Sequence, residues 1–208
     1  MNAATQTLTL PGSAGGIEAL LDVPADGIVR GTAVIAHPHP LFGGTMQNKV
    51  VQTLARAFVQ CGWQAVRFNF RGVGASAGTY DEGRGEAEDM LAVVEQVAPT
   101  GPLALAGFSF GAFVTSHVAQ TLAPVRSLDK LVLVGTAASR FVVAPVAPEL
   151  HEKTLVLHGE QDDTVPLSSV MDWARPQSLP VTVIPGVEHF FHGQLPLLRS
   201  LVVRHLRA

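Results

Sequence analysis

The feature that most constrains the fold is a pattern that repeats from Gly31 onward. A short, uninterrupted apolar run is followed by a turn of glycine or polar residues, and then by a stretch in which apolar residues recur at helical spacing. Continuous apolar runs are typical of parallel strands that helices cover on both faces, so the pattern predicts an open, mostly parallel, doubly wound α/β sheet. The predicted strands span residues 32–36, 64–70, 103–106, 130–134, 154–157 and 181–184. The predicted helices span residues 48–60, 85–97, 112–122, 168–175 and a last segment that begins at Phe190 or Leu195 and ends at His205.

The first thirty residues follow a different pattern. Apolar and polar residues alternate in 5–10 and again in 17–23, and the segment between them, 11–16, is rich in glycine. Alternation is typical of strands with one face in water, so these segments predict an N-terminal antiparallel hairpin at the sheet edge. The whole sheet would then have about eight strands. Because the 208 residues contain no linker and no repeat, we expect one domain spanning 1–208.

Composition narrows the classes of partner and environment. Apolar residues make up 47% of the chain and charged residues 15%, which is typical of a globular protein. The formal net charge of −3 is too small to attract polyanions, so we expect neither nucleic acid nor a membrane as partner. Cys61 is the single cysteine, which excludes an intramolecular disulfide and favours the cytoplasm. Residues 1–10 contain no Lys or Arg and thus lack the basic region of a signal peptide.

The most specific chemical signal is the sequence Gly-Phe-Ser-Phe-Gly at 107–111. It directly follows a predicted strand and directly precedes a predicted helix. G-x-S-x-G in that setting is typical of a sharp turn that lifts a serine hydroxyl above the sheet, beside a helix N-terminus that favours negative charge. The two glycines let the backbone and the helix approach closely. We therefore predict that Ser109 is a nucleophile.

A serine hydroxyl becomes an effective nucleophile when a base removes its proton and a carboxylate orients that base. Candidates for both groups follow Ser109 in the chain. Asp162 and Asp163 come after the predicted strand 154–157, and His189 and His192 come after the predicted strand 181–184. Since the carboxyl ends of parallel strands meet at one edge of the sheet, these side chains are expected near Ser109. The order serine, acid, histidine is that of the α/β arrangement of this catalytic machinery.

Several motifs together resemble a known superfamily. The sequence His-Gly-Glu-Gln-Asp-Asp-Thr-Val-Pro at 158–166 and the sequence Gly-Val-Glu-His-Phe-Phe at 186–191, beside G-x-S-x-G, resemble α/β hydrolases. The sequences HPHPLFGGTM at 37–46 and NFRGVG at 69–74 more narrowly resemble a small bacterial group of lidless hydrolases related to dienelactone hydrolases.

The resemblance covers nearly the whole chain and implies an α/β-hydrolase fold without a large lid. It assigns Asp162 to the acid and His189 to the base, and makes Asp163 and His192 their competitors. Many of these relatives have cysteine where this chain has Ser109, so their lactone substrate is not carried over.

The oxyanion that forms during acyl transfer requires hydrogen-bond donors. The first predicted donor is the backbone N–H of Phe110, the residue after the nucleophile. The second donor is expected in the loop after the predicted strand 32–36. Two prolines of that loop have no N–H, which leaves His39, Leu41, Phe42 and Gly43. The sequence Leu-Phe-Gly-Gly resembles the corresponding loop of dienelactone hydrolases, and this resemblance implies Leu41.

These observations predict a serine hydrolase that cleaves small carboxylic esters with short to medium acyl groups through an acyl-enzyme, without a cofactor or metal. Its substrate cleft is predicted to include His39, Phe42, Phe108, Phe190 and Phe191. The alternatives are a binding module on the same fold without turnover, a thioesterase or lactone hydrolase, and a metal-dependent hydrolase built on the H-x-H pair His37 and His39.

Overall fold

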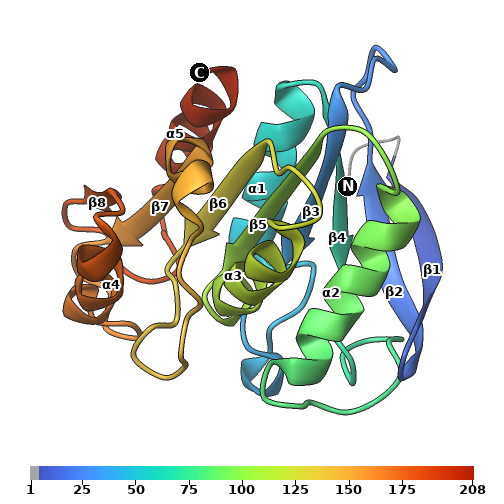
Figure 1. Cartoon of the computed structure of the whole chain (residues 1–208), viewed down its shortest axis with the longest axis horizontal. Coiled ribbons are helices and arrows are strands. Elements are labelled where there is room, and N and C mark those ends of the chain that lie inside the picture. Colours follow the sequence, from blue (N-terminus) through green and yellow to red (C-terminus); the bar gives the residue numbers. More distant parts are fainter. Residues whose placement is uncertain (1–4) are drawn as a thin grey trace.

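The computed structural model describes residues 5–208, which are built around an eight-stranded sheet (Figure 1). The strands are β1 (Gln6–Gly12), β2 (Gly15–Asp22), β3 (Gly31–Ala36), β4 (Trp63–Phe68), β5 (Leu103–Phe108), β6 (Lys130–Val134), β7 (Thr154–Gly159) and β8 (Val181–Ile184). Their order across the sheet is β1-β2-β4-β3-β5-β6-β7-β8. β2 pairs antiparallel with β1 and with β4, and the remaining neighbours are parallel. The predicted fold class is confirmed.

Helices cover both faces of the sheet (Figure 1). One face carries α1 (Lys49–Gln60) and α5 (Leu195–Arg207), and the other carries α2 (Arg84–Val97), α3 (Phe110–Leu122) and α4 (Leu167–Ala174). The short 3-10 helices η1 (Pro40–Phe42), η2 (Pro148–Lys153) and η3 (Arg175–Gln177) lie in the connections. Because both faces are covered, every residue of β3 and β5 is buried, which explains why these strands read as continuous apolar runs.

The N-terminal hairpin is tighter than its sequence predicts. Pro11 pairs with Gly16 and Gly12 pairs with Gly15, so the strands extend into the predicted turn and only residues 13 and 14 remain as the loop. The glycines of this segment therefore lie in the paired ends of the two strands. Thr5, the predicted first residue of the hairpin, lies just outside β1.

Other boundaries also differ from the predictions. β4 ends at Phe68, two residues early. The amide of Asn69 still donates to the carbonyl of Glu18, its partner in the register with β2, but the amide of Phe70 donates to the His37 side chain and not to a neighbouring strand. β5 and β7 each run two residues further than predicted, into the G-x-S-x-G and His-Gly motifs. The last helix begins at Leu195, the later of its two predicted starts.

The carboxyl ends of β3, β5, β7 and β8 lie at the same edge of the sheet because these strands are parallel. The loops that follow them contain the residues singled out from the sequence. No helix within residues 5–208 has the length and apolar character needed to cross a membrane.

Candidate active site

Ser109 occupies a strained turn between β5 and α3. Its φ of 57° and ψ of −117° lie in a region that L residues rarely adopt. The chain holds this conformation because the Ser109 amide donates to the carbonyl of Val134 on β6, and the Ser109 carbonyl accepts from the amides of Ala112 and Phe113 in α3. Strain of this kind is typical of a functional residue that the surrounding structure fixes in place.

The two glycines of the motif allow this turn to pack. A Cβ on Gly107 would lie 2.3 Å from the carbonyl oxygen of Gly111, and a Cβ on Gly111 would lie 2.5 Å from the carbonyl oxygens of Ala36 and His37. Backbone atoms cannot yield to such contacts as a flexible side chain can. The turn therefore requires glycine at both positions, as the motif predicts.

The structure brings Ser109, Asp162 and His189 together from three different loops. Nε2 of His189 lies 3.0 Å from Oγ of Ser109, and Nδ1 of the same ring lies 2.6 Å from Oδ2 of Asp162. All three residues are buried, with His189 only 2% exposed. Gly135 makes room for the imidazole, since a Cβ there would lie 3.2 Å from Cε1 of His189.

The two competing residues do not join this group. Asp162 is oriented by its own loop, because its Oδ1 accepts from the amides of Thr164 and Val165 at 3.0 and 2.7 Å. Asp163 is exposed, and within residues 5–208 its carboxylate accepts a hydrogen bond from the Thr164 hydroxyl alone. His192 is exposed and lies 3.1 Å from Glu188 on the surface.

His158, at the end of β7, lies directly behind the carboxylate. Its Nε2 is 2.9 Å from the carbonyl oxygen of Val165 and 3.5 Å from Oδ2 of Asp162. Burial lowers the pKa of His158 below its ordinary value, so the ring is neutral and Nε2–H donates to Val165. His158 thus supports the loop that carries Asp162.

His37 and His39 hold the loop after β3. Nδ1 of His37 donates to the Pro38 carbonyl at 2.6 Å, and its Nε2 accepts from the amide of Phe70. Nδ1 of His39 accepts from the amide of Leu41, and its Nε2 lies 3.3 Å from the hydroxyl of Tyr80. These hydrogen bonds already occupy the ring nitrogens that the H-x-H interpretation would give to a metal.

A cavity of about 300 Å³ opens above Ser109. Its walls come from the loops after β3, β6, β7 and β8. The residues that line it are Pro38, His39, Phe42, Gly43, Gly44, Asn48, Ser109, Phe110, Ala137, Arg140, Phe141, Thr164, Val165, His189 and Phe190.

Of the five predicted cleft residues, His39, Phe42 and Phe190 line this cavity, and Phe108 and Phe191 do not. Both of these are fully buried in the core between the sheet and α1 and α5. Phe108 packs behind His189, with ring centroids 5.0 Å apart, so it supports the imidazole without facing the cavity. The prediction that they wall the cleft is therefore wrong.

The long connection after β6, residues 136–152, is by its length predicted to hold a short helix or a small cover over a site, but sequence reasoning did not identify which of its residues wall the cavity. Ala137, Arg140 and Phe141 line the cavity from this side, and the connection ends in η2. The unusual length of the connection was the available signal, because loops of this length often cover a site. Its sequence carries no motif that would identify the individual residues.

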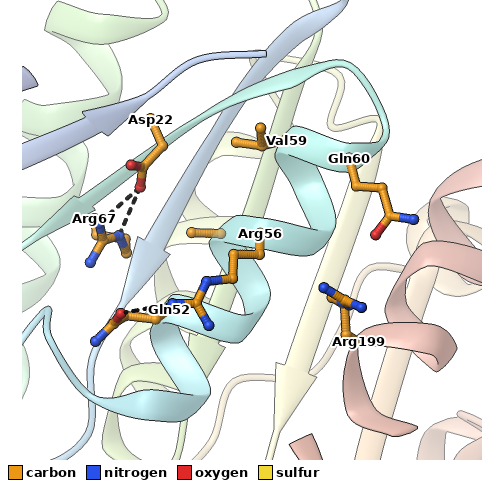
Figure 2. Close-up of a pocket in the computed structure, with 8 residues that line it drawn as sticks. Asp22, Gln52, Arg56, Val59, Gln60, Arg67 and Arg199 are labelled. Atoms are coloured by element: carbon orange, nitrogen blue, oxygen red, sulfur yellow. Dashed lines mark hydrogen bonds and ion pairs between the residues drawn. The ribbon is translucent and has the colours of Figure 1, made fainter. Parts of the chain in front are cut away.

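A second cavity, of about 350 Å³, lies between α1 and α5 beside β2 and β4 (Figure 2). Arg67 at its floor donates to Asp22 through Nε and Nη2, and Arg56 donates to Gln52 at its wall (Figure 2). The lining contains no serine, cysteine or histidine, and neither Ser109 nor His189 contributes to it. Ser109 and His189 line the first of these two cavities and not the second.

Comparison with known proteins identifies the family of this chain. The model of a family described as serine aminopeptidase, S33, matches residues 29–143, more than half of the chain. Protein RP471 of Rickettsia prowazekii is 30% identical over 170 residues, which are 76% of this chain and 71% of that protein. The structure of XC6422 from Xanthomonas campestris, an α/β serine hydrolase without a lid, is 37% identical, covers 100% of this chain and 95% of its own, and has a TM-score of 0.88. An α/β serine hydrolase homologue from Coxiella burnetii is 41% identical over 97% of each chain, with a TM-score of 0.82. The chain therefore belongs to the S33 family of α/β serine hydrolases.

Proposed function

We propose that this hydrolase cleaves small carboxylic esters with short to medium acyl groups, using Ser109, His189 and Asp162 as a catalytic triad. The observation that carries the proposal is the position of the His189 ring, 3.0 Å from the Ser109 hydroxyl and 2.6 Å from the Asp162 carboxylate. An imidazole held in this way can accept the serine proton at Nε2 while the carboxylate keeps Nδ1 protonated and stabilises the resulting cation.

The reaction then proceeds in two steps. Oγ of Ser109 attacks the carbonyl carbon while its proton passes to His189, and the C–O bond to the alcohol breaks as the alcohol takes that proton. The product of this step is an ester of Ser109. Water next attacks the acyl-enzyme, gives its proton to His189, and the serine leaves with that proton as the carboxylic acid is released.

Several backbone N–H groups at the cavity are available to stabilise the oxyanion. The amides of Phe110, His39 and Gly43 have no hydrogen-bond acceptor within residues 5–208, and all three residues line the cavity with Ser109. The amide of Leu41, the donor that resemblance implies, is instead bonded to Nδ1 of His39, and Leu41 does not line the cavity. We assign the first donor to Phe110 and the second to His39, because the rings of these two residues pack with centroids 4.9 Å apart, which places His39 beside the residue that follows Ser109.

The dimensions and the walls of the cavity support a small ester as the substrate. Its volume of about 300 Å³ is at the lower end of the range for small-molecule sites. Apolar walls from Phe42, Phe141 and Phe190 suit an acyl chain, and the open mouth suits a small ester.

The test combines a fluorophosphonate probe with p-nitrophenyl esters of increasing acyl length. Labelling and hydrolysis are expected in the wild type and in Ser168→Ala, an exposed control in the first turn of α4, and are expected to disappear in Ser109→Ala. Labelling or turnover that persists in Ser109→Ala would overturn the proposal. Ligand binding without turnover would favour a silent binding module, and turnover that a chelator abolishes would favour metal-dependent hydrolysis.

A further inference from the structure

Resting on the function proposed above, we infer that Arg140 gives the active-site cavity a subsite for a carboxylate, so that the preferred substrates are esters that carry a negative charge. The chemical class is a monoester of a dicarboxylic acid, or an ester whose alcohol part bears the carboxylate. The juxtaposition that carries the inference is a guanidinium without an acidic partner in the same cavity as the Ser109 hydroxyl.

Charge in the cavity is uneven. Among its fifteen lining residues, Arg140 is the only Arg or Lys, and there is no Asp or Glu. The other walls are aromatic, small or neutral polar residues. A cation that faces such a cavity without an acidic neighbour favours ligands of opposite charge, and arginine binds carboxylates through parallel hydrogen bonds.

The guanidinium of Arg140 has no ion pair or hydrogen bond with any part of the chain from residue 5 to residue 208. Two acidic residues that adjoin the lining, Glu82 and Asp163, have other partners. Glu82 borders the groove on the outer side of Arg140, but its carboxylate pairs with Arg84 at 3.6 Å. Asp163 is exposed and accepts from the Thr164 hydroxyl. The positive charge is therefore left for a ligand.

Contacts also fix where this charge lies. The carbon at the centre of the guanidinium is 6.0 Å from the ring centroid of Phe42, which comes from the loop after β3. The amides of Arg140 and Phe141 both donate to the carbonyl of Ala137, so the turn that carries the arginine is ordered. Arg140 and Phe42 thus meet across the cavity from opposite loops.

The field of Arg140 reaches the loop that holds the proposed oxyanion donor. The pKa of His39 is lowered, first by burial and second by the charge of Arg140. A cation within reach of His39 is also within reach of the part of a substrate that extends past this residue. Because Arg140 is exposed, salt would screen its attraction for a carboxylate.

The experiment compares matched charged and neutral substrates in the intact protein. For the acyl side, the pair is mono-4-nitrophenyl glutarate and 4-nitrophenyl pentanoate. For the alcohol side, it is 4-carboxyphenyl acetate and phenyl acetate. We expect a ratio of kcat/KM, charged over neutral, that exceeds one in one of the pairs and falls about tenfold in Arg140→Gln, the size expected for a hydrogen-bonded charge pair.

Two further variants sharpen the test. Arg140→Lys should recover part of the ratio because it restores the charge without the planar fork. Arg56→Gln removes one positive charge from the second cavity and should leave the ratio as in the wild type. The pair that responds identifies the side of the ester that carries the carboxylate.

A ratio that is the same in the wild type and in Arg140→Gln for both pairs would overturn the inference. If the neutral esters were still hydrolysed through Ser109 in that case, the proposed esterase function would stand without the subsite. If neither charged nor neutral esters were hydrolysed, the proposed function itself would fail.

Discussion

The backbone amide of Phe70 donates a 3.0 Å hydrogen bond to Nε2 of His37, and so ties the loop after β4 to the loop after β3. Nδ1 of the same ring donates to the Pro38 carbonyl. A ring that accepts at one nitrogen and donates at the other must be neutral. Burial accordingly lowers the pKa of His37 from 6.5 to about 4.

This pairing predicts a loss of stability in acid. Below pH 6.5 the unfolded chain takes up a proton at His37 that the folded chain does not, so the free energy of unfolding should fall as the pH drops from about 6.5 to about 4. The full contribution of His37 is about 3 kcal/mol and is present above pH 6.5. Urea unfolding at a series of pH values measures it.

The variant His37→Gln isolates the contribution of this residue to the pH dependence of stability. Glutamine can donate and accept but does not titrate, so the variant should show a smaller dependence of unfolding free energy on pH. His205 is a second contributor of the same sign, because burial and Lys130 lower its pKa to about 4. An unchanged pH dependence in His37→Gln would show that the imidazole is not held neutral.

The adjacent Asp162 and Asp163 provide a matched pair for the acid of the triad. Asp162 lies 2.6 Å from the His189 ring, whereas Asp163 is exposed and away from it. Asp162→Asn should lower kcat by about 10³ to 10⁴, because the amide favours the wrong tautomer of the imidazole. Asp163→Asn should change kcat less than twofold. Steady-state hydrolysis of p-nitrophenyl acetate measures both values of kcat. A larger loss of kcat in Asp163→Asn than in Asp162→Asn would assign the acid to Asp163.

Phe190 and Phe191 are neighbours in the chain with opposite surroundings. Phe190 lines the cavity and is 41% exposed, and Phe191 is fully buried. Phe190→Ala should alter the preference for acyl length and leave Tm nearly unchanged. Phe191→Ala should cost about 3–5 kcal/mol of unfolding free energy, because it leaves a void in the core. Thermal unfolding and hydrolysis of a series of esters of increasing acyl length test this contrast. Equal losses of stability in the two variants would contradict it.

This pair also illustrates what the sequence can and cannot predict. The parallel strands and the setting of Ser109 follow from local patterns, because burial on both faces and a sharp turn each leave a mark on consecutive residues. The direction of a side chain in a loop leaves no such mark. Phe191 turns into the core where the backbone adopts a φ of 56°, and no pattern in the surrounding residues indicates it.

In the loop after β3, the sequence also fails to predict which backbone amides stay free of hydrogen bonds. The sequence reduces the second oxyanion donor to a few amides by excluding the prolines, but the choice among them depends on which amides find acceptors. Leu41 loses its free N–H to the side chain of His39, a contact that exists only once the loop is folded. Arg140 likewise lines the cavity only in the folded connection after β6, where its amide donates to the carbonyl of Ala137.

The most direct test of the central claim is the mass of the protein during turnover. A reaction with p-nitrophenyl acetate is quenched in acid within the first turnovers, and the intact protein and its peptides are weighed. Our account predicts one added acetyl group, located on Ser109 and missing in Ser109→Ala. Fast hydrolysis by a protein that never carries an acyl group on Ser109, at any quench time, would contradict it.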